Sequence, residues 1–333
     1  MKTRIFSVLV LCGALSTWGG VAAAACTCAG TFDPSTVPGY NSSPGVNPTL
    51  TACLVNPAGT VSGTVNATGC DIGVYYSPGK SGSVNGAAIS GANYFGVLVN
   101  GASVDVVNST ISNVGPAINN FGNVQYRPGG ILFLNGANCS KGRHDDGHPS
   151  DDDDGHQSAC GIYGNTITQP LWGKFGITAK NAGTNVAVYG NTIAGNGSNG
   201  GIAQNGIEIS DGAEADIEQN TVENNQYTGT DTNATGILIY GGPGLAGAGA
   251  FEGPNYTGQL EVQNNTLTNN DVGVVLWNVN SPVSKPPKRT NNDVSQNSIS
   301  NDGTSANIYS AGIIYGSGNG DTIDDNTVYG AGY

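Results

Sequence analysis

The stretch Tyr189-Gly190-Asn191-Thr192-Ile193 decides the fold, because the same phrase returns along the chain. An Asn followed by Thr or Ser and then by an apolar residue recurs at Asn165, Asn220, Asn265, Asn297 and Asn326, with looser copies at Ser109 and Ala87. Self-similarity at a period of about 20–50 residues is typical of a solenoid or propeller. The sequence therefore predicts a repeat architecture, whereas no stretch of it predicts a particular reaction.

A second, shorter pattern follows each phrase after a polar connection of variable length. It consists of Gly, an apolar residue, any residue and a second apolar residue, and it begins at Gly176, Gly206, Gly236, Gly273 and Gly312. Alternation with period two indicates a strand with one face toward a core. One repeat thus predicts two short strands bent around the Asn, a longer connection and a third, Gly-led strand. Stacked repeats would form three parallel sheets.

The recurring Asn suits a bend between strands. Asn tolerates the left-handed backbone conformation better than most residues that carry a Cβ, and stacked amide side chains can hydrogen-bond to one another as a ladder. The expected ladder positions are Gly63, Ala87, Ser109, Asn165, Asn191, Asn220, Asn265, Asn297 and Asn326. At the strand spacing of about 4.8 Å, these positions predict a rod of about nine coils, roughly 40 Å long.

The phrase and the Gly-led strand together resemble the right-handed parallel β-helix repeat of the pectin lyase-like superfamily, over roughly residues 60–333. The resemblance implies an all-β, right-handed, three-sheet parallel β-helix. That superfamily includes polysaccharide lyases, glycoside hydrolases, epimerases, phage tail proteins and adhesins, so the fold by itself does not specify an activity.

Residues 1–25 have the layout of a secretory signal. Lys2 and Arg4 precede an apolar run over residues 5–15, and alanines at 22–25 offer cleavage sites. The run is too short to span a bilayer. We therefore expect a secreted or periplasmic protein. A lipoprotein cleaved before Cys26 is the less favoured alternative, because lipidation would leave one cysteine unpaired.

Cleavage of the signal leaves an even set of cysteines, Cys26, Cys28, Cys53, Cys70, Cys139 and Cys160. In an exported chain such a set indicates disulfides. Proximity predicts a Cys139–Cys160 bridge and two bridges among the first four. We expect residues 26–58, which lack the phrase, to form a disulfide-tied cap over the open first coil, and residues 59–333 to form the β-helix.

The chain is acidic, with a formal net charge of −13. Such a surface repels nucleic acid and anionic membranes, and it would need a bridging Ca²⁺ to hold a polyanionic polysaccharide. The 53 glycines and 11% charged residues suit stacked short strands better than a helical enzyme. The expected partners are an extracellular polysaccharide or cell-surface polymer, with end-to-end or loop-mediated self-association as a further possibility.

An acidic insertion at residues 138–160 holds all three histidines of the chain. Imidazole with carboxylate suits Zn²⁺, Mn²⁺ or Cu²⁺, and carboxylates attract Ca²⁺. The candidate ligands are His144, Asp145, Asp146, His148, Asp151, Asp153 and His156. The spacing does not match an EF-hand, and the composition favours the alternative of a solvated low-complexity loop. No other cofactor is predicted.

The outer face of the Gly-led sheet is the second candidate site. Two residues after each Gly, and again two residues later, side chains should point outward, so Lys180, Glu208, Tyr240 and Trp277 should share this face. Trp172, Lys174 and Arg127 lie in connections that lead into the sheet. Aromatic rings with a few polar groups are typical of a groove that binds sugars.

Catalysis in this groove would rest on Glu208 and Asp211 as acid and base, with Lys180 to neutralise charge. Glycoside hydrolysis needs two carboxyl groups about 5–9.5 Å apart, and the paired-aspartate and Arg-rich motifs of polygalacturonases and pectate lyases are absent from this sequence. We therefore favour non-catalytic binding of carbohydrate or a surface polymer, with Lys180 and Glu208 as a solvated ion pair. The alternatives are a polysaccharide lyase, hydrolase or epimerase, and a structural or adhesive rod.

Overall fold

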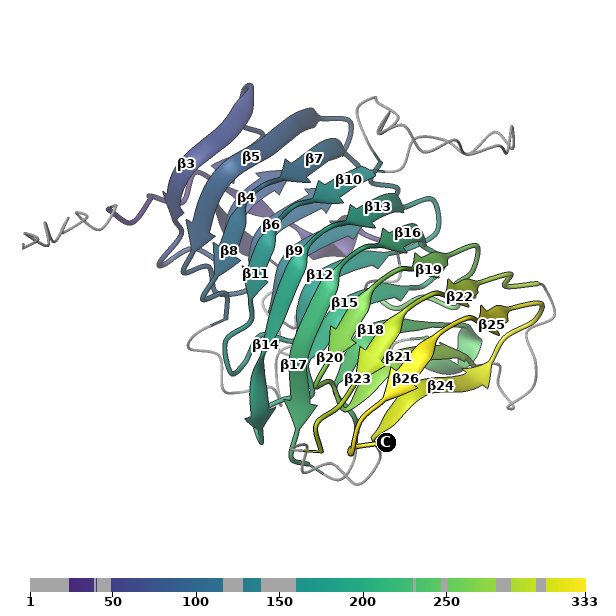
Figure 1. Cartoon of the computed structure of the whole chain (residues 1–333). Helices are drawn as coiled ribbons and strands as arrows, with labels where there is room; N and C mark the ends of the chain where they lie inside the picture. The colour runs from purple at the N-terminus through teal and green to yellow at the C-terminus, as the bar shows by residue number, and fades with distance from the viewer. Residues whose placement is uncertain are drawn as a thin grey trace, which may run out of the picture.

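The computed structural model describes residues 24–38, 40, 49–115, 128–138, 160–229, 232–246, 251–279, 289–303 and 310–333. This part of the chain is nearly all parallel β-structure (Figure 1), and its helical content consists of two short 3₁₀ turns, η1 (Pro34–Thr36) and η2 (Pro243–Leu245). No helix among the described residues is long and apolar enough to cross a membrane. The all-β prediction is confirmed.

The Gly-led strands share one ten-stranded sheet, as the repeat predicts. In order across the sheet they are β1 (Gly30–Phe32), β2 (Leu50–Val55), β4 (Ile72–Tyr76), β6 (Phe95–Asn100), β9 (Gly129–Leu134), β12 (Phe175–Lys180), β15 (Asn205–Ser210), β18 (Thr235–Gly241), β21 (Val272–Asn278) and β24 (Ala311–Ser317). All neighbours are parallel except the pair β1 and β2.

The remaining strands form two stacks on either side of the Asn corner. The acidic stack holds β7 (Ser103–Val107), β10 (Cys160–Tyr163), β13 (Asn185–Tyr189), β16 (Glu214–Glu218), β19 (Glu261–Gln263), β22 (Asp293–Ser295) and β25 (Thr322–Asp324). The Thr stack holds β8 (Thr110–Ser112), β11 (Thr166–Thr168), β14 (Thr192–Asn199), β17 (Thr221–Tyr227), β20 (Thr266–Thr268), β23 (Ser298–Ser300) and β26 (Thr327–Tyr329).

These two stacks are one sheet rather than the two that the repeat predicts. The long strand β5 (Ser81–Ser90) runs through the corner and pairs with β7 on one side and β8 on the other, while β3 (Thr60–Asn66) pairs with β5. Gly86 takes φ = 66° within β5, so this strand bends there without ending. The structure thus has two hydrogen-bonded sheets where three were expected.

The asparagine ladder is present as predicted. Asn191 donates from its backbone N and from Nδ2 to Asn220 Oδ1, at 3.0 Å in both cases, and its Nδ2 also reaches Ile162 O at 2.7 Å. The same backbone-to-amide bond repeats at every step from Ser109 to Asn326. Asn165, Asn191, Asn220, Asn265 and Asn297 are each 1% exposed, so the ladder is a buried polar column that fixes the register of the stack.

The left-handed corner residue is not the ladder Asn, which corrects the sequence prediction. It is the residue before it, with φ between 46° and 65° at Asn108, Gly164, Gly190, Gln219, Asn264, Gln296 and Asp325. All seven of these residues are exposed. The reason is geometric, because the ladder side chain must point between coils and the chain therefore reverses one residue earlier.

The leading glycines are required by the close approach of neighbouring strands. A Cβ at Gly176 would lie 2.5 Å from the Ile193 side chain and 2.8 Å from Gly206 O, and a Cβ at Gly206 would meet Val222 and Gly236 O in the same way. Inside the stacks, aliphatic residues form one continuous core. The period-two pattern that begins at each Gly points its apolar residues into that core.

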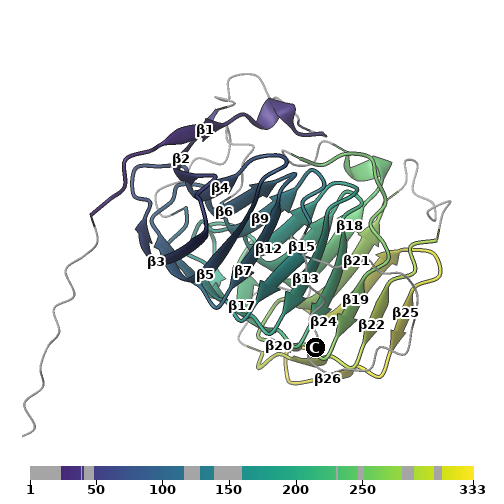
Figure 2. The same ribbon diagram turned by 90° about the horizontal axis from the view of Figure 1, so that it is seen from above.

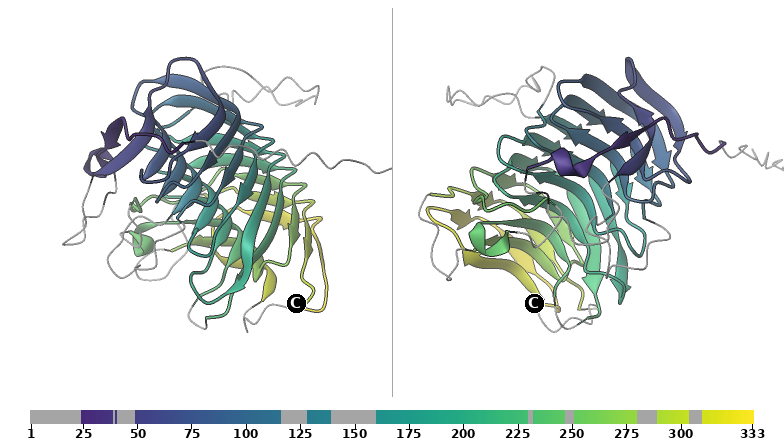
Figure 3. Two further views of the ribbon diagram at one scale, coloured as in Figure 1. Left: turned by 90° about the vertical axis from the view of Figure 1, so that its left-hand side faces the viewer. Right: turned by 180° about the vertical axis from the view of Figure 1, so that it is seen from behind.

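The N-terminal segment is tied down by two disulfides, Cys26–Cys53 and Cys28–Cys70. β1 pairs antiparallel with β2 and so covers one edge of the Gly-led sheet, and η1 then lies across the outer face of that sheet (Figure 3). Within residues 26–58, β2 is itself a strand of the Gly-led sheet, and the cap stays a prediction. Residues 1–23, Cys139 and the side chain of Cys160 lie outside the described part, so the signal and the third bridge stay predictions.

Candidate functional site

The outer face of the Gly-led sheet is covered over its N-terminal half. The N-terminal segment that contains β1 passes over this sheet (Figure 2). Phe32 and Val37 from that segment and Phe251 from the loop after β18 pack on the outer face and bury it. The outward residues Tyr75, Leu98, Leu132 and Phe175 are all at most 6% exposed. The predicted groove is therefore not open there, because these apolar side chains form a second core instead of lining a solvent channel.

The register within the sheet matches the prediction. Lys180, Ser210, Tyr240 and Trp277 are direct neighbours on β12, β15, β18 and β21. They point outward because the alternate residues, such as Ala179, are buried in the main core. This outward row runs from the covered half of the sheet to its open half.

Lys180 forms the centre of a buried polar cluster. Its Nζ lies 2.6 Å from Glu208 Oε1 and 3.1 Å from Ser210 Oγ, and it also contacts Glu252 Oε1. The Tyr240 hydroxyl donates to Glu252 Oε1 at 2.6 Å and lies 3.4 Å from Lys180 Nζ. Lys180, Glu208 and Glu252 are only 6%, 4% and 3% exposed. The predicted pair is therefore an ion pair, but a buried one rather than a solvated one.

The second carboxylate oxygen of Glu208 is also occupied. Asn205 Nδ2 donates to Glu208 Oε2 at 2.6 Å, and Thr235 Oγ1 in turn donates to Asn205 Oδ1 at 2.9 Å. Lys174 adds a positive charge near Glu208 while its Nζ donates to Ala203 O at 2.5 Å. Each charged atom of the Lys180–Glu208 pair thus has hydrogen-bonding partners inside the protein.

The electrostatics hold Lys180 and Glu208 in their ionised forms. Burial acts to lower the pKa of Lys180, but the charges of Glu208 and Glu252 and their hydrogen bonds together raise it above its ordinary value. Burial acts to raise the pKa of Glu208, but Lys180, Lys174 and the Asn205 amide lower it. Burial and the same two carboxylates raise the pKa of Tyr240. None of these shifts moves a group toward titration near neutral pH, where a general acid or base works best.

Asp211 does not join Glu208 and Lys180. Its carboxylate accepts hydrogen bonds from Asn181 Nδ2 at 2.9 Å and from the backbone N and Nδ2 of Asn255 at 3.0 and 2.9 Å. Asp211 also has φ = 51°, which places it at the turn after β15. Asp211 therefore holds in place the loop that carries Glu252, and it takes no part in the Lys180 cluster.

Glu252 and Phe251 are the site residues that the sequence did not single out. Both belong to residues 251–258, the covering loop, which returns across the sheet after the Gly/Ala-rich connection. Asn181 Nδ2 donates to Phe251 O at 3.1 Å, and the ring of Phe251 lies 6.4 Å from that of Phe32. In the sequence, the feature that could have pointed to these two residues is a Phe-Glu pair within a run of small residues.

The open part of the outer face lies beyond the covering loop. Trp277 is 48% exposed and Tyr240 is half-buried, and these two are paired neighbours on adjacent strands. Trp172 is also half-buried, but it lies in the connection before β12 and packs near Gly201. The predicted sugar-binding residues therefore fall in two places, and Arg127 lies outside the described residues.

The candidate metal ligands are not among the residues that the structure describes. His144, Asp145, Asp146, His148, Asp151, Asp153 and His156 all lie outside it. Among the residues that are described, no group of three or more His, Cys, Asp or Glu side chains is placed to hold a metal ion. Metal binding by the acidic insertion thus stays a prediction.

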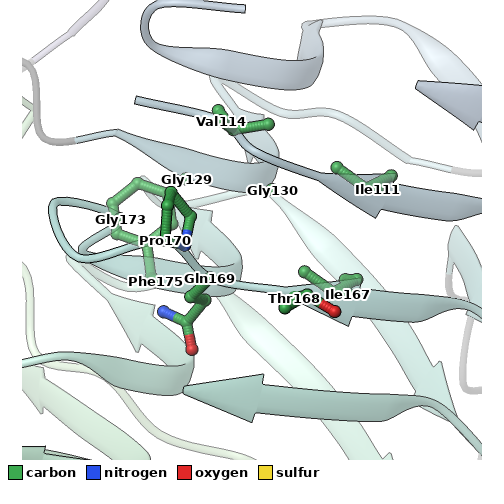
Figure 4. A pocket seen from close by; sticks show the side chains of 10 residues that line it. All are labelled: Ile111, Val114, Gly129, Gly130, Ile167, Thr168, Gln169, Pro170, Gly173 and Phe175. Atoms are coloured by element: carbon green, nitrogen blue, oxygen red, sulfur yellow. The ribbon is translucent and has the colours of Figure 1, made fainter. Parts of the chain in front are cut away.

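A small hollow lies at the corner between the Thr stack and the Gly-led sheet (Figure 4). It is lined mainly by Ile111, Val114, Ile167, Gln169 and Phe175, and it has no room for a water-sized molecule. It is therefore a packing defect of the core rather than a ligand site.

Comparison of the chain with family models, with curated proteins and with solved structures finds no match.

Proposed function

We propose that the protein is an exported right-handed parallel β-helix of about nine coils, similar to those of the pectin lyase-like superfamily, that binds carbohydrate or a cell-surface polymer without catalysis. The in-register parallel stacks and the buried ladder support the β-helix. The Cys26–Cys53 and Cys28–Cys70 disulfides indicate an extracellular or periplasmic location.

The pair formed by Tyr240 and Trp277 carries the binding proposal. Their register places the two aromatic side chains one strand spacing apart, about 4.8 Å. Trp277 is exposed, and Tyr240 beside it is half-buried, with its hydroxyl bonded to Glu252 of the covering loop. Aromatic rings with a polar handle at an exposed site suit the faces of sugar rings. A polymer that ran across the strands would meet Tyr240 and Trp277 in succession.

We propose binding without catalysis because the polar groups of the Lys180 cluster are bonded to one another and to Asn205. Glu208 and Glu252 share one ammonium group, the Tyr240 hydroxyl donates to Glu252, and Asn205 occupies the remaining oxygen of Glu208. A glycosidase needs one carboxyl that can give a proton and a second that can accept one or attack. Two carboxylates paired with the same lysine fit a structural network better.

The enzyme alternative keeps one specific observation in its favour. Glu208 and Glu252 come from different segments and meet at one lysine beside a tyrosine hydroxyl, which is the composition of many acid–base sites. If the covering loop moved away, Lys180 and Glu208 would be uncovered together. The binding test therefore includes a search for products.

The test is affinity electrophoresis of the mature protein in gels that contain neutral or acidic polysaccharides, with assays for reducing ends and for unsaturated uronides. We expect retardation by at least one polysaccharide, lost in Trp277→Ala, and no product. Turnover that Glu208→Gln abolishes would replace the proposal with the enzyme alternative. Failure to bind any polysaccharide would favour the adhesive rod.

A further inference from the structure

The two disulfides that tie down the N-terminal segment lie in contact with each other. Cys26 is bridged to Cys53, and Cys28 is bridged to Cys70. Cys26 Sγ and Cys70 Sγ, which belong to different bridges, are 3.7 Å apart. Since bonded sulfurs are about 2.0 Å apart, an approach of about 1.7 Å would join these two. The four sulfurs therefore have a second pairing within reach.

Each bridge has one cysteine near the surface and one inside the protein. Cys26 and Cys28 are half-buried, whereas Cys53 is 2% exposed and Cys70 is 0% exposed. Thiol–disulfide exchange requires direct attack of a thiolate on one of the two bonded sulfurs. A thiolate that comes from solvent should therefore attack the half-buried cysteine of a bridge and displace the buried one.

Attack on Cys28 sends the leaving sulfur inward. The sulfur of the external thiolate bonds to Cys28 Sγ, the Cys28–Cys70 bond breaks, and the electron pair of that bond goes to Cys70 Sγ. Cys70 belongs to the main apolar core, and burial in such surroundings disfavours a charged thiolate. The sulfur of the other bridge that it already contacts is Cys26 Sγ. A second exchange, on that bridge, is therefore the direct way to move the charge on.

We propose that the two bridges form a thiol-exchange site, which takes an external thiol of low molecular weight at Cys28 and relays the exchange inward. In the second step Cys70 Sγ bonds to Cys26 Sγ and the Cys26–Cys53 bond breaks. Cys53 leaves with the electron pair and takes up the proton that the external thiol gave up. The number of S–S bonds is unchanged, because the mixed disulfide at Cys28 and the new Cys26–Cys70 bridge replace the two original ones. No oxidant or further reductant is required.

The exchange changes how the N-terminal segment is held. In the structure, Cys28 is bonded to the core just ahead of β1, and Phe32 of β1 packs on the outer face of the Gly-led sheet. After the exchange, the segment keeps its covalent tether at Cys26 and loses the one at Cys28. β1 keeps its pairing with β2 but has no disulfide beside it, so we expect it to open more often. The relay would loosen one cover of this face without releasing the segment.

The experiment treats the folded mature protein with reduced glutathione and maps its thiols over time. The reaction is stopped in mildly acidic denaturant that contains N-ethylmaleimide, and peptic fragments that separate Cys53 from Cys70 are analysed by mass spectrometry without reduction. We expect glutathione on the fragment that holds Cys26 and Cys28, and the maleimide on Cys53. Maleimide on Cys70 instead would show that the second step does not occur, and the proposal would be wrong.

The matched variant is Cys28→Ala combined with Cys70→Ala, which keeps the Cys26–Cys53 bridge and removes the relay. We expect the Cys53 thiol to appear much more slowly in this variant than in the wild type. Equal rates would show that glutathione attacks Cys26 directly, which overturns the relay. If the variant does not fold, the position of the maleimide in the wild type still decides the second step.

Amide hydrogen exchange measures the effect on the N-terminal segment. We expect the amides of β1 to exchange faster after glutathione treatment, while those of β12, which lies inside the same sheet, stay unchanged. Unchanged exchange in β1 would contradict the loosening of this segment.

Discussion

Removal of one amide from the middle of the ladder should cost several kcal/mol of stability. In Asn220→Ala, the backbone N and the Nδ2 group of Asn191 both lose their acceptor, Asn220 Oδ1, and Val188 O loses a donor. These groups are buried between coils, where water does not replace the lost partner. A buried polar group left unpaired costs about 1–3 kcal/mol. Two stranded donors therefore predict a loss of about 2–6 kcal/mol in the free energy of unfolding.

The matched control is Asn326→Ala at the last step of the ladder. Asn326 Oδ1 accepts from Asn297 in the same way, but Asn326 is half-exposed, so water can take its place and we expect a loss of about 1 kcal/mol. The assay is urea unfolding followed by circular dichroism, with an unchanged m value as the sign that the unfolding reaction is the same. If Asn220→Ala costs no more than Asn326→Ala, the ladder does not stabilise the stack.

Three further changes test the cluster and its cover. Lys180→Met leaves Glu208 and Glu252 buried without their cation and should lower the free energy of unfolding by about 3–5 kcal/mol. Most of this loss should be recovered in the triple variant that adds Glu208→Gln and Glu252→Gln. Equal melting temperatures of the single and triple variants would contradict this. The pKa of Glu208 is lower in the folded protein than in the unfolded chain, where it is about 4.3. The ionised Glu208 therefore stabilises the fold above about pH 4.3, and this stabilisation is lost as the pH falls through the folded-state pKa. The melting temperature of the wild type should therefore fall below about pH 4, more steeply than that of the triple variant. Phe251→Ala should cost about 3–5 kcal/mol and make the covering loop sensitive to limited proteolysis, whereas an unchanged digestion pattern would show that the loop is held by other contacts.

The sequence was sufficient to predict the stack, the ladder and the outward row because each depends on a short pattern that repeats. A phrase such as Asn191-Thr192-Ile193 specifies a corner, a solvent side chain and a core side chain in three residues. Equal spacing from the leading Gly then brought Lys180 and Tyr240 onto one face. These features can be predicted from the local repeat alone, because they do not depend on contacts between segments that are distant in the sequence.

The covering of that face was missed because it depends on segments that do not repeat. Phe32 and Phe251 are far apart in the sequence and meet only over the folded sheet. Glu252 likewise reaches Lys180 from a connection whose path no pattern indicates. The left-handed residue lies one position before the predicted one. Gly and Asn both favour that conformation and both occur at the bend, so the sequence does not show which of the two neighbouring residues adopts it.

Fluorescence of the two tryptophans that follow residue 25, Trp172 and Trp277, tests the binding face most directly. The mature protein is titrated with the polysaccharide that retards it, alongside Trp172→Phe and Trp277→Phe. We predict a saturable change in emission that persists in Trp172→Phe and disappears in Trp277→Phe. A change that follows Trp172 instead, or that survives the loss of Trp277, would contradict the assignment of the open aromatic face as the binding site.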